Sequence, residues 1–68
     1  MNTAYYLHID FTNGSNPWHS LPVYTEKELK KIIRKWTRNY EVVSERTELW
    51  LDGMISTTYL RLKEKVGA

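Results

Sequence analysis

The chain contains no cysteine, only two prolines and three glycines, and no long hydrophobic run. Without cysteine it can form neither a disulfide scaffold nor a thiolate zinc site. No apolar stretch approaches the roughly 20 residues of a membrane-spanning helix, and residues 1–5 lack the basic segment and apolar run of a signal peptide. These absences predict a cytoplasmic protein without membrane contact. The length of 68 residues predicts a single domain over residues 1–68.

The strongest periodic pattern in the sequence is helical and lies between residues 25 and 40. Five apolar side chains recur at the spacing of one helix face: Leu29, Ile32, Ile33, Trp36 and Tyr40. Thr25, followed three residues later by Glu28, is typical of a capping box at a helix N-terminus. The sequence therefore predicts an amphipathic helix over residues 26–39 whose apolar side faces the core.

The net charge of +2 is unevenly distributed along the chain. Residues 26–39 carry six basic and two acidic side chains, a net charge of +4, whereas the rest of the chain carries a net charge of −2. The basic residues fall on the helix side opposite the apolar stripe: Lys27, Lys30, Lys31, Arg34, Lys35 and Arg38. Two explanations stay open, because a lysine-rich surface keeps a helix soluble and suits its dipole, but also attracts an anionic partner.

The segment before the helix divides into a strand and a loop. Residues 5–12 alternate apolar and polar side chains, which predicts a half-buried strand. Residues 13–24 begin with consecutive turn-forming residues and contain both prolines. Because proline lacks the backbone donor of a strand ladder, this segment is predicted to form a loop, or at most an edge strand.

The segments 42–51 and 54–64 are predicted to form a hairpin. The Asp52-Gly53 sequence between them is typical of a two-residue turn with positive φ at both positions. Symmetric pairing about this turn makes paired residue numbers add up to 105. The core side of the hairpin then carries Val43, Leu49, Leu51, Leu60 and Leu62. Glu45 does not fit this side, which predicts a β-bulge within residues 44–46.

These elements predict an α+β fold of the order β-α-β-β, with one amphipathic helix packed on one face of a three-stranded antiparallel sheet. No helix then covers the opposite face of the sheet. This face carries apolar and aromatic side chains beside an arginine: Arg46, Trp50, Ile55 and Tyr59. Such an exposed patch is unusual on a monomer. It suits a homodimer interface, a contact site for another protein or a stacking platform for single-stranded nucleic acid, unless residues 13–24 cover it.

The sequence predicts neither an enzyme nor a cofactor. It contains no serine in a nucleophile elbow and no glycine-rich loop that would bind phosphate. A metal site with three ligands could in principle be formed by His8, Asp10 and His19. Because His8 and Asp10 on one short strand are more typical of solvent-facing side chains, no metal site is predicted.

A basic helix opposite a core is also the usual electrostatic footprint of a nucleic-acid-binding protein. The sequence, however, predicts no second helix for a helix-turn-helix motif, and it lacks the glycine-rich aromatic strand of RNA-recognition sheets. Charge is therefore the only signal for nucleic-acid binding, which is kept as the second hypothesis.

Residues 11–18 (FTNGSNPW), 25–29 (TEKEL) and 35–40 (KWTRNY) resemble small single-domain proteins encoded by bacterial phages and mobile elements. Anti-CRISPR proteins, which block a host nuclease or regulator by binding to it, are among these proteins. The resemblance implies a stoichiometric binder that acts inside a bacterial cell. It lies in style and layout and assigns a role to no single residue.

The prediction from the sequence is a small non-enzymatic binding protein, a phage-type inhibitor or regulator that contacts a protein of a host or defence complex. The contact residues predicted on the helix are Lys27, Lys31, Arg34 and Arg38, and those on the open sheet face are Arg46, Trp50 and Tyr59. A nucleic-acid-binding accessory protein and a structural homodimer are the alternatives.

Overall fold

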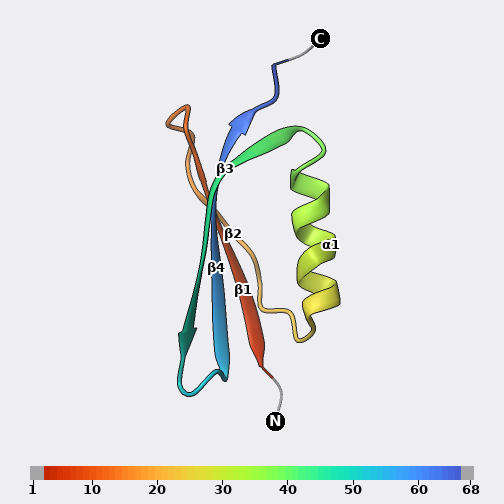
Figure 1. The fold of residues 1–68 in the computed structure, drawn as a ribbon, viewed down its shortest axis with the longest axis vertical. Helices are drawn as coiled ribbons and strands as arrows, with labels where there is room; N and C mark the ends of the chain where they lie inside the picture. Colours follow the sequence, from red (N-terminus) through yellow and green to blue (C-terminus); the bar gives the residue numbers. More distant parts are fainter. Residues whose placement is uncertain (1–2, 67–68) are drawn as a thin grey trace.

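The computed structural model describes residues 3–66, which form four strands and one helix (Figure 1). The elements are β1 (Ala4–Phe11), β2 (Trp18–His19), α1 (Glu26–Trp36), β3 (Tyr40–Trp50) and β4 (Ile55–Glu64). The predicted α+β class is confirmed. Within the described residues, no helix has the length and apolar character needed to cross a bilayer.

The sheet differs from the predicted one in strand number and direction. Its order is β2-β1-β4-β3, and β1 pairs with β4 in parallel along its whole length. The predicted three-stranded antiparallel sheet is therefore wrong. A parallel pair needs a long crossover, and here the crossover includes β2, α1 and β3. The fourth strand, β2, lies within residues 13–24, which were predicted as a loop, and pairs with the outer edge of β1.

The helix begins as predicted and ends earlier. Oγ1 of Thr25, the N-cap residue, accepts a hydrogen bond from the backbone N–H of Glu28 at 3.1 Å. The helix ends at Trp36, and Thr37 is its C-cap, so the predicted end at residue 39 is too late. The strands begin and end within one or two residues of the predicted limits of 5–12, 42–51 and 54–64.

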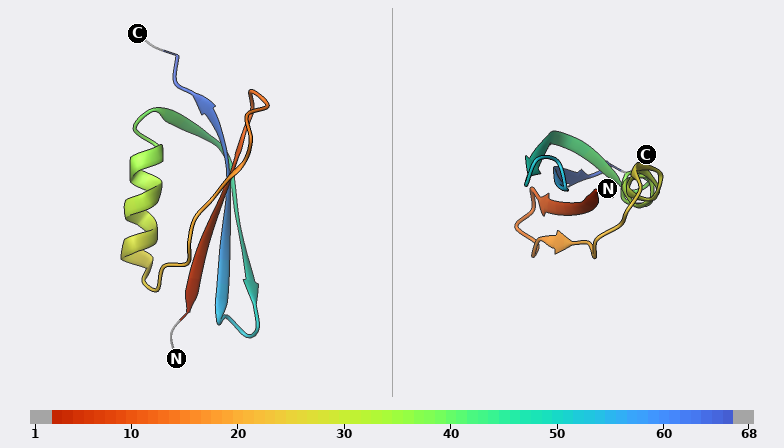
Figure 2. Two further views of the ribbon diagram at one scale, coloured as in Figure 1. Left: turned by 180° about the vertical axis from the view of Figure 1, so that it is seen from behind. Right: turned by 90° about the horizontal axis from the view of Figure 1, so that it is seen from below.

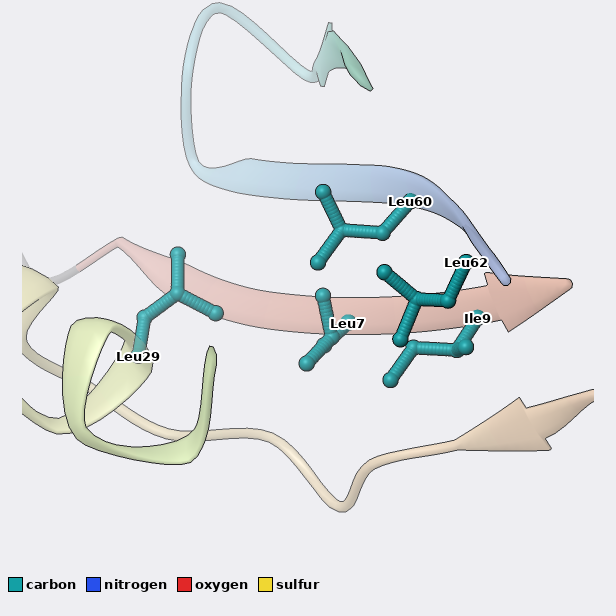
Figure 3. Packing of buried hydrophobic residues seen from close by; sticks show 5 residues of the cluster. All are labelled: Leu7, Ile9, Leu29, Leu60 and Leu62. Carbon is teal, nitrogen blue, oxygen red and sulfur yellow. The ribbon is translucent and has the colours of Figure 1, made fainter. Parts of the chain in front are cut away.

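The core lies between α1 and the β1–β4 pair. Its buried apolar side chains are Leu7, Ile9, Leu29, Leu60 and Leu62 (Figure 3). At one end of this core, four aromatic rings form a cluster with neighbouring centroids 5.1 to 5.7 Å apart: Phe11, Trp18, Trp36 and Tyr40. Aromatic pairs at such distances contribute about 0.5–1.5 kcal/mol beyond their buried area. The cluster thus holds the C-terminal end of α1 against the sheet.

Much of β3 lies outside this core. Leu49 and Leu51, which were predicted to be buried, are each 68% exposed, and Val43 is 51% exposed. The helix packs against β1, while the C-terminal end of β3 lies on the far side of β4 (Figure 2). The predicted core side is therefore confirmed for Leu60 and Leu62 and wrong for the three residues in and next to β3.

The predicted hairpin register is confirmed between Ser44 and Trp50, where paired residue numbers add up to 105. The register then shifts between Val42 and Ser44. The irregularity thus falls at Val43, just before the predicted range of 44–46. Glu45 keeps its predicted side but is exposed, because the helix does not cover this part of the sheet.

The turn of the hairpin is wider than predicted. Leu51, Asp52 and Gly53 have φ values of 50°, 55° and 84°, so positive φ extends one residue beyond the predicted pair. The N–H of Gly53 donates to the carbonyl of Trp50, and the N–H of Met54 donates to the carbonyl of Leu51, each at 3.1 Å. This conformation is sterically unfavourable for leucine, because its Cβ approaches the following carbonyl oxygen.

Candidate partner-binding surfaces

The seven predicted contact residues lie on two opposite sides of the molecule. We call the first side the helix cationic surface; it consists of Lys27, Lys30, Lys31, Arg34, Lys35 and Arg38. We call the second side the open sheet face; it carries Tyr6, His8, Asp10, His19, Arg46, Glu48, Trp50, Ile55, Thr57, Tyr59 and Arg61. Because α1 covers only the other face of the sheet, one flat ligand cannot contact both surfaces at once.

All six side chains of the helix cationic surface are exposed. The ion pairs found within residues 3–66 join His8 to Asp10, Arg46 to Glu48 and Lys63 to Glu41, and none of them includes a helix cation. Four of the cations, together with Glu28, line a shallow depression of about 260 Å³: Lys27, Lys30, Lys31 and Arg34. The positive charge of this surface is therefore not compensated by ion pairs within the described part of the chain.

The orientation of these cations follows from the packing of α1. Leu29 is buried and Trp36 joins the aromatic cluster, which places Lys27, Lys31 and Arg34 on the solvent side. Arg38 belongs to the predicted site but lies in the turn after the helix, beyond the C-cap. Its side chain is exposed, yet the helical period no longer determines its direction.

The structure brings Arg46 and Tyr59 together on the open sheet face. The guanidinium carbon of Arg46 lies 4.4 Å from the ring centroid of Tyr59, in a cation–π contact. Nη1 of Arg46 also lies 3.6 Å from Oε2 of Glu48. Trp50, the third predicted residue, pairs with Ile55 near the turn and is 55% exposed. The three predicted residues thus belong to one exposed surface with aromatic rings and an oriented cation.

Two histidines meet on the open sheet face beside Tyr59, whose ring centroid lies 5.3 Å from that of His8. His8 and His19 are directly opposite each other in β1 and β2, and their Nδ1 atoms lie 3.1 Å apart. In this hydrogen bond one Nδ1 carries the hydrogen and donates, and the other accepts. Nε2 of His8 lies 3.1 Å from Oδ1 of Asp10. Within residues 3–66, no group of three or more His, Cys, Asp or Glu residues is arranged to hold a metal ion.

Residues 13–24 do not cover the open sheet face, so that alternative is wrong. The segment extends the sheet through β2, where Trp18 packs against the core and His19 is exposed. The sequence grouped His19 with His8 and Asp10 only by composition. The strand that places His19 opposite His8 was not predicted, because residues 13–24 were expected to form a loop.

A groove of about 270 Å³ lies on the helix side of the sheet, where α1 leaves β3 uncovered. Its walls include Leu29, Lys30 and Glu45, and its floor includes Thr47 and Thr58, whose hydroxyl oxygens are 3.5 Å apart. These groups can form hydrogen bonds with a ligand.

No family model, curated protein or solved structure matches this chain. The helix cationic surface offers charge without acidic partners among the described residues, and the open sheet face offers aromatic rings beside an oriented arginine.

Proposed function

We propose that the protein is a non-enzymatic binding protein that contacts an acidic patch of a partner protein through the helix cationic surface. The observation that carries this proposal is the accumulation of like charges along one side of α1. Three pairs of these cations are four residues apart: Lys27 with Lys31, Lys31 with Lys35, and Lys30 with Arg34. Like charges at this spacing destabilise a helix by about 0.2–0.5 kcal/mol per pair, so a bound anionic partner explains them better than stability does.

The acidic residues of the same helix favour a protein partner over a nucleic acid. Glu26 and Glu28 are exposed in the first turn, and Glu28 lines the same depression as four of the cations. A nucleic-acid backbone is anionic along its whole length and is repelled by these carboxylates. A protein surface can instead oppose them with a basic side chain, so the mixed pattern suits charge-complementary protein contact.

The resemblance to small phage-encoded proteins indicates the kind of partner. Some proteins of this kind, anti-CRISPR proteins among them, act by occupying the surface of a host protein, which requires affinity and no catalytic group. We therefore extend the proposal to a phage-type inhibitor or regulator of a host or defence complex, acting in the bacterial cytoplasm.

Charge reversal on the helix tests the proposal directly. A partner would first be isolated with tagged protein and purified, and its association with the wild type and with Lys31→Glu/Arg34→Glu would be followed at two salt concentrations. We expect the variant to associate at least tenfold more slowly at low salt, with a weaker salt dependence, because long-range attraction mainly accelerates association. Far-UV circular dichroism should remain unchanged, since both side chains are exposed.

Lys63→Glu/Lys65→Glu is the matched control, because it changes the net charge equally at exposed positions outside α1 and outside the residues named on the open sheet face. It should affect association much less than the helix variant does. Equal association of the helix variant and the wild type would contradict the proposal.

Nucleic-acid binding, the second candidate, is separated by gel shift with duplex DNA, single-stranded DNA and RNA at two salt concentrations. Our proposal expects no shift at physiological salt. If the protein instead binds duplex DNA, the logarithm of its affinity should fall with the logarithm of salt with a slope of about −0.9 per neutralised phosphate.

A further inference from the structure

We propose that the protein forms a homodimer in which two β3 strands pair antiparallel along their free edges. A two-fold axis perpendicular to the sheet passes through Thr47, and the two four-stranded sheets join into one sheet of eight strands. This inference concerns the edge of β3 and does not depend on the helix cationic surface. It also differs from a dimer through the open sheet face.

The hydrogen bonds of the sheet show which backbone groups of β3 are free. The N–H of Ala4 donates to the carbonyl of Met54 at 2.9 Å, and the N–H of Thr12 donates to the carbonyl of Leu62 at 3.0 Å. Even-numbered residues of β4 therefore face β1, and odd-numbered residues face β3, because backbone groups alternate along a strand. Their partners in β3 are even-numbered as far as Ser44. The odd-numbered residues 45, 47 and 49 thus direct their N–H and carbonyl groups away from the sheet.

The regular part of β3 is centred on Thr47. It is limited on one side by the register shift between Val42 and Ser44, and on the other by the positive φ of Leu51. The seven residues between these limits, 44–50, pair without interruption with β4. A two-fold axis at Thr47 pairs all seven with their counterparts in a second copy.

The same axis makes the charges of the two edges complementary. Arg46 lies opposite Glu48 of the second copy, and Glu48 lies opposite Arg46 of the second copy. Because these residues bond to β4 on the inner side, they occupy the non-hydrogen-bonded positions of the new pair, where side chains approach most closely. Opposite charges in such pairs are stabilising.

Neighbouring registers lack this complementarity. An axis through residue 45, 46 or 48 would place two glutamates, two arginines or two glutamates directly opposite each other. Charges on an edge strand usually prevent association. On this edge they favour one antiparallel register with a second copy of the same strand and disfavour those on either side.

The opposite edge of the sheet explains why association should stop at two copies. There, β2 has only two residues, and Pro17 and Pro22 lie on either side of it. Short edge strands and prolines prevent further strand pairing. Both α1 helices of the dimer lie on the same side of the joined sheet, and their cationic surfaces stay accessible.

The first test is the mass in solution of the full chain, measured by light scattering and sedimentation over a dilution series. We expect a mass of twice 8.1 kDa at high micromolar concentration, falling towards 8.1 kDa on dilution. Thr47→Pro should remain a folded monomer, because the N–H that it removes faces outward and the new ring occupies the axis. Thr47→Val, which keeps the N–H, should still dimerise.

The second test exchanges the charges. Arg46→Glu places glutamates opposite glutamates and Glu48→Arg places arginines opposite arginines, so each variant alone should dimerise at least tenfold more weakly than the wild type. An equimolar mixture of the two variants should form a heterodimer, because each then meets the opposite charge. The double variant Arg46→Glu/Glu48→Arg should dimerise like the wild type.

Three outcomes would overturn the inference. They are a wild type that stays monomeric at all concentrations, a dimer that survives Thr47→Pro, and a mixture of the two charge variants that does not associate. Circular dichroism of each variant shows that it is folded, so a loss of mass can be assigned to the interface. A failure of this dimer leaves the test of the helix cationic surface unaffected.

Discussion

Two neighbouring strands of this sheet, β4 and β3, show how little of a residue's burial is decided by its own strand. Both alternate side chains between the same two faces, and they pair with each other over most of their length. Leu60 and Leu62 of β4 are nevertheless buried, whereas Leu49 of β3 is exposed on the same face. The difference arises because α1 packs against β1, next to β4, and leaves β3 uncovered. Alternation therefore assigns a side chain to a face, and the helix position decides which part of that face is core.

The largest expected contrast is between two tryptophans. Trp36→Ala should lower the free energy of unfolding by about 3–5 kcal/mol, because it removes the ring that contacts Phe11, Trp18 and Tyr40. Trp50→Ala, on the open sheet face, should cost less than about 1 kcal/mol. Urea denaturation of both variants measures the contrast, and equal losses would break it.

A pair of leucines tests the same comparison within the hairpin. Leu60→Ala should cost about 2–5 kcal/mol, since the side chain is 2% exposed and its removal leaves a cavity. Leu49→Ala should change stability by no more than about 0.5 kcal/mol. Thermal unfolding at low micromolar protein concentration avoids a contribution from dimerisation. A large effect at Leu49 would show that β3 is covered in solution.

The helix cap gives a smaller effect on the packed side of the molecule. Thr25→Ala removes the hydroxyl that accepts the N–H of Glu28 and should cost about 1 kcal/mol. Thr12→Ala, at another exposed position, is the control and should be close to neutral. Chemical denaturation followed by the helical signal in far-UV circular dichroism would detect the difference.

The smallest expected effect is a gain of stability on the exposed side. Leu51→Asn should raise the free energy of unfolding by about 0.5–1 kcal/mol, because asparagine tolerates positive φ better than leucine does. Leu49→Asn, in the extended part of β3, should instead be neutral or slightly destabilising. A loss of stability in Leu51→Asn would show that the turn has another conformation in solution.

Local signals in the sequence were sufficient for several elements of the fold. The capping pair Thr25 and Glu28 identified the start of α1, and Asp52-Gly53 identified the hairpin and its register. The direction of β1 was not predictable in this way. A half-buried strand shows the same alternation whether its neighbour is parallel or antiparallel, and the pairing partner of β1 lies more than 40 residues away in the chain.

The candidate surfaces were predictable to different degrees. The positions of Lys27, Lys31 and Arg34 follow from the helical period alone, because an apolar stripe directs the opposite side to solvent. The contact of Arg46 with Tyr59 required the hairpin register, which the turn supplied. The contact of His8 with His19 and the free edge of β3 both depend on strand order, and no local pattern of residues encodes strand order.

The sequence by itself determined the amphipathic helix, the hairpin and the alternation of side chains along β1 and the regular part of the hairpin, because these follow from interactions between residues close together in the chain. Only the tertiary structure decided that β1 lies parallel to β4, that β2 and β3 form the two edges, and that α1 covers one half of the sheet. Those features depend on which distant segments bury each other's apolar surface most completely, and that competition involves the whole chain at once.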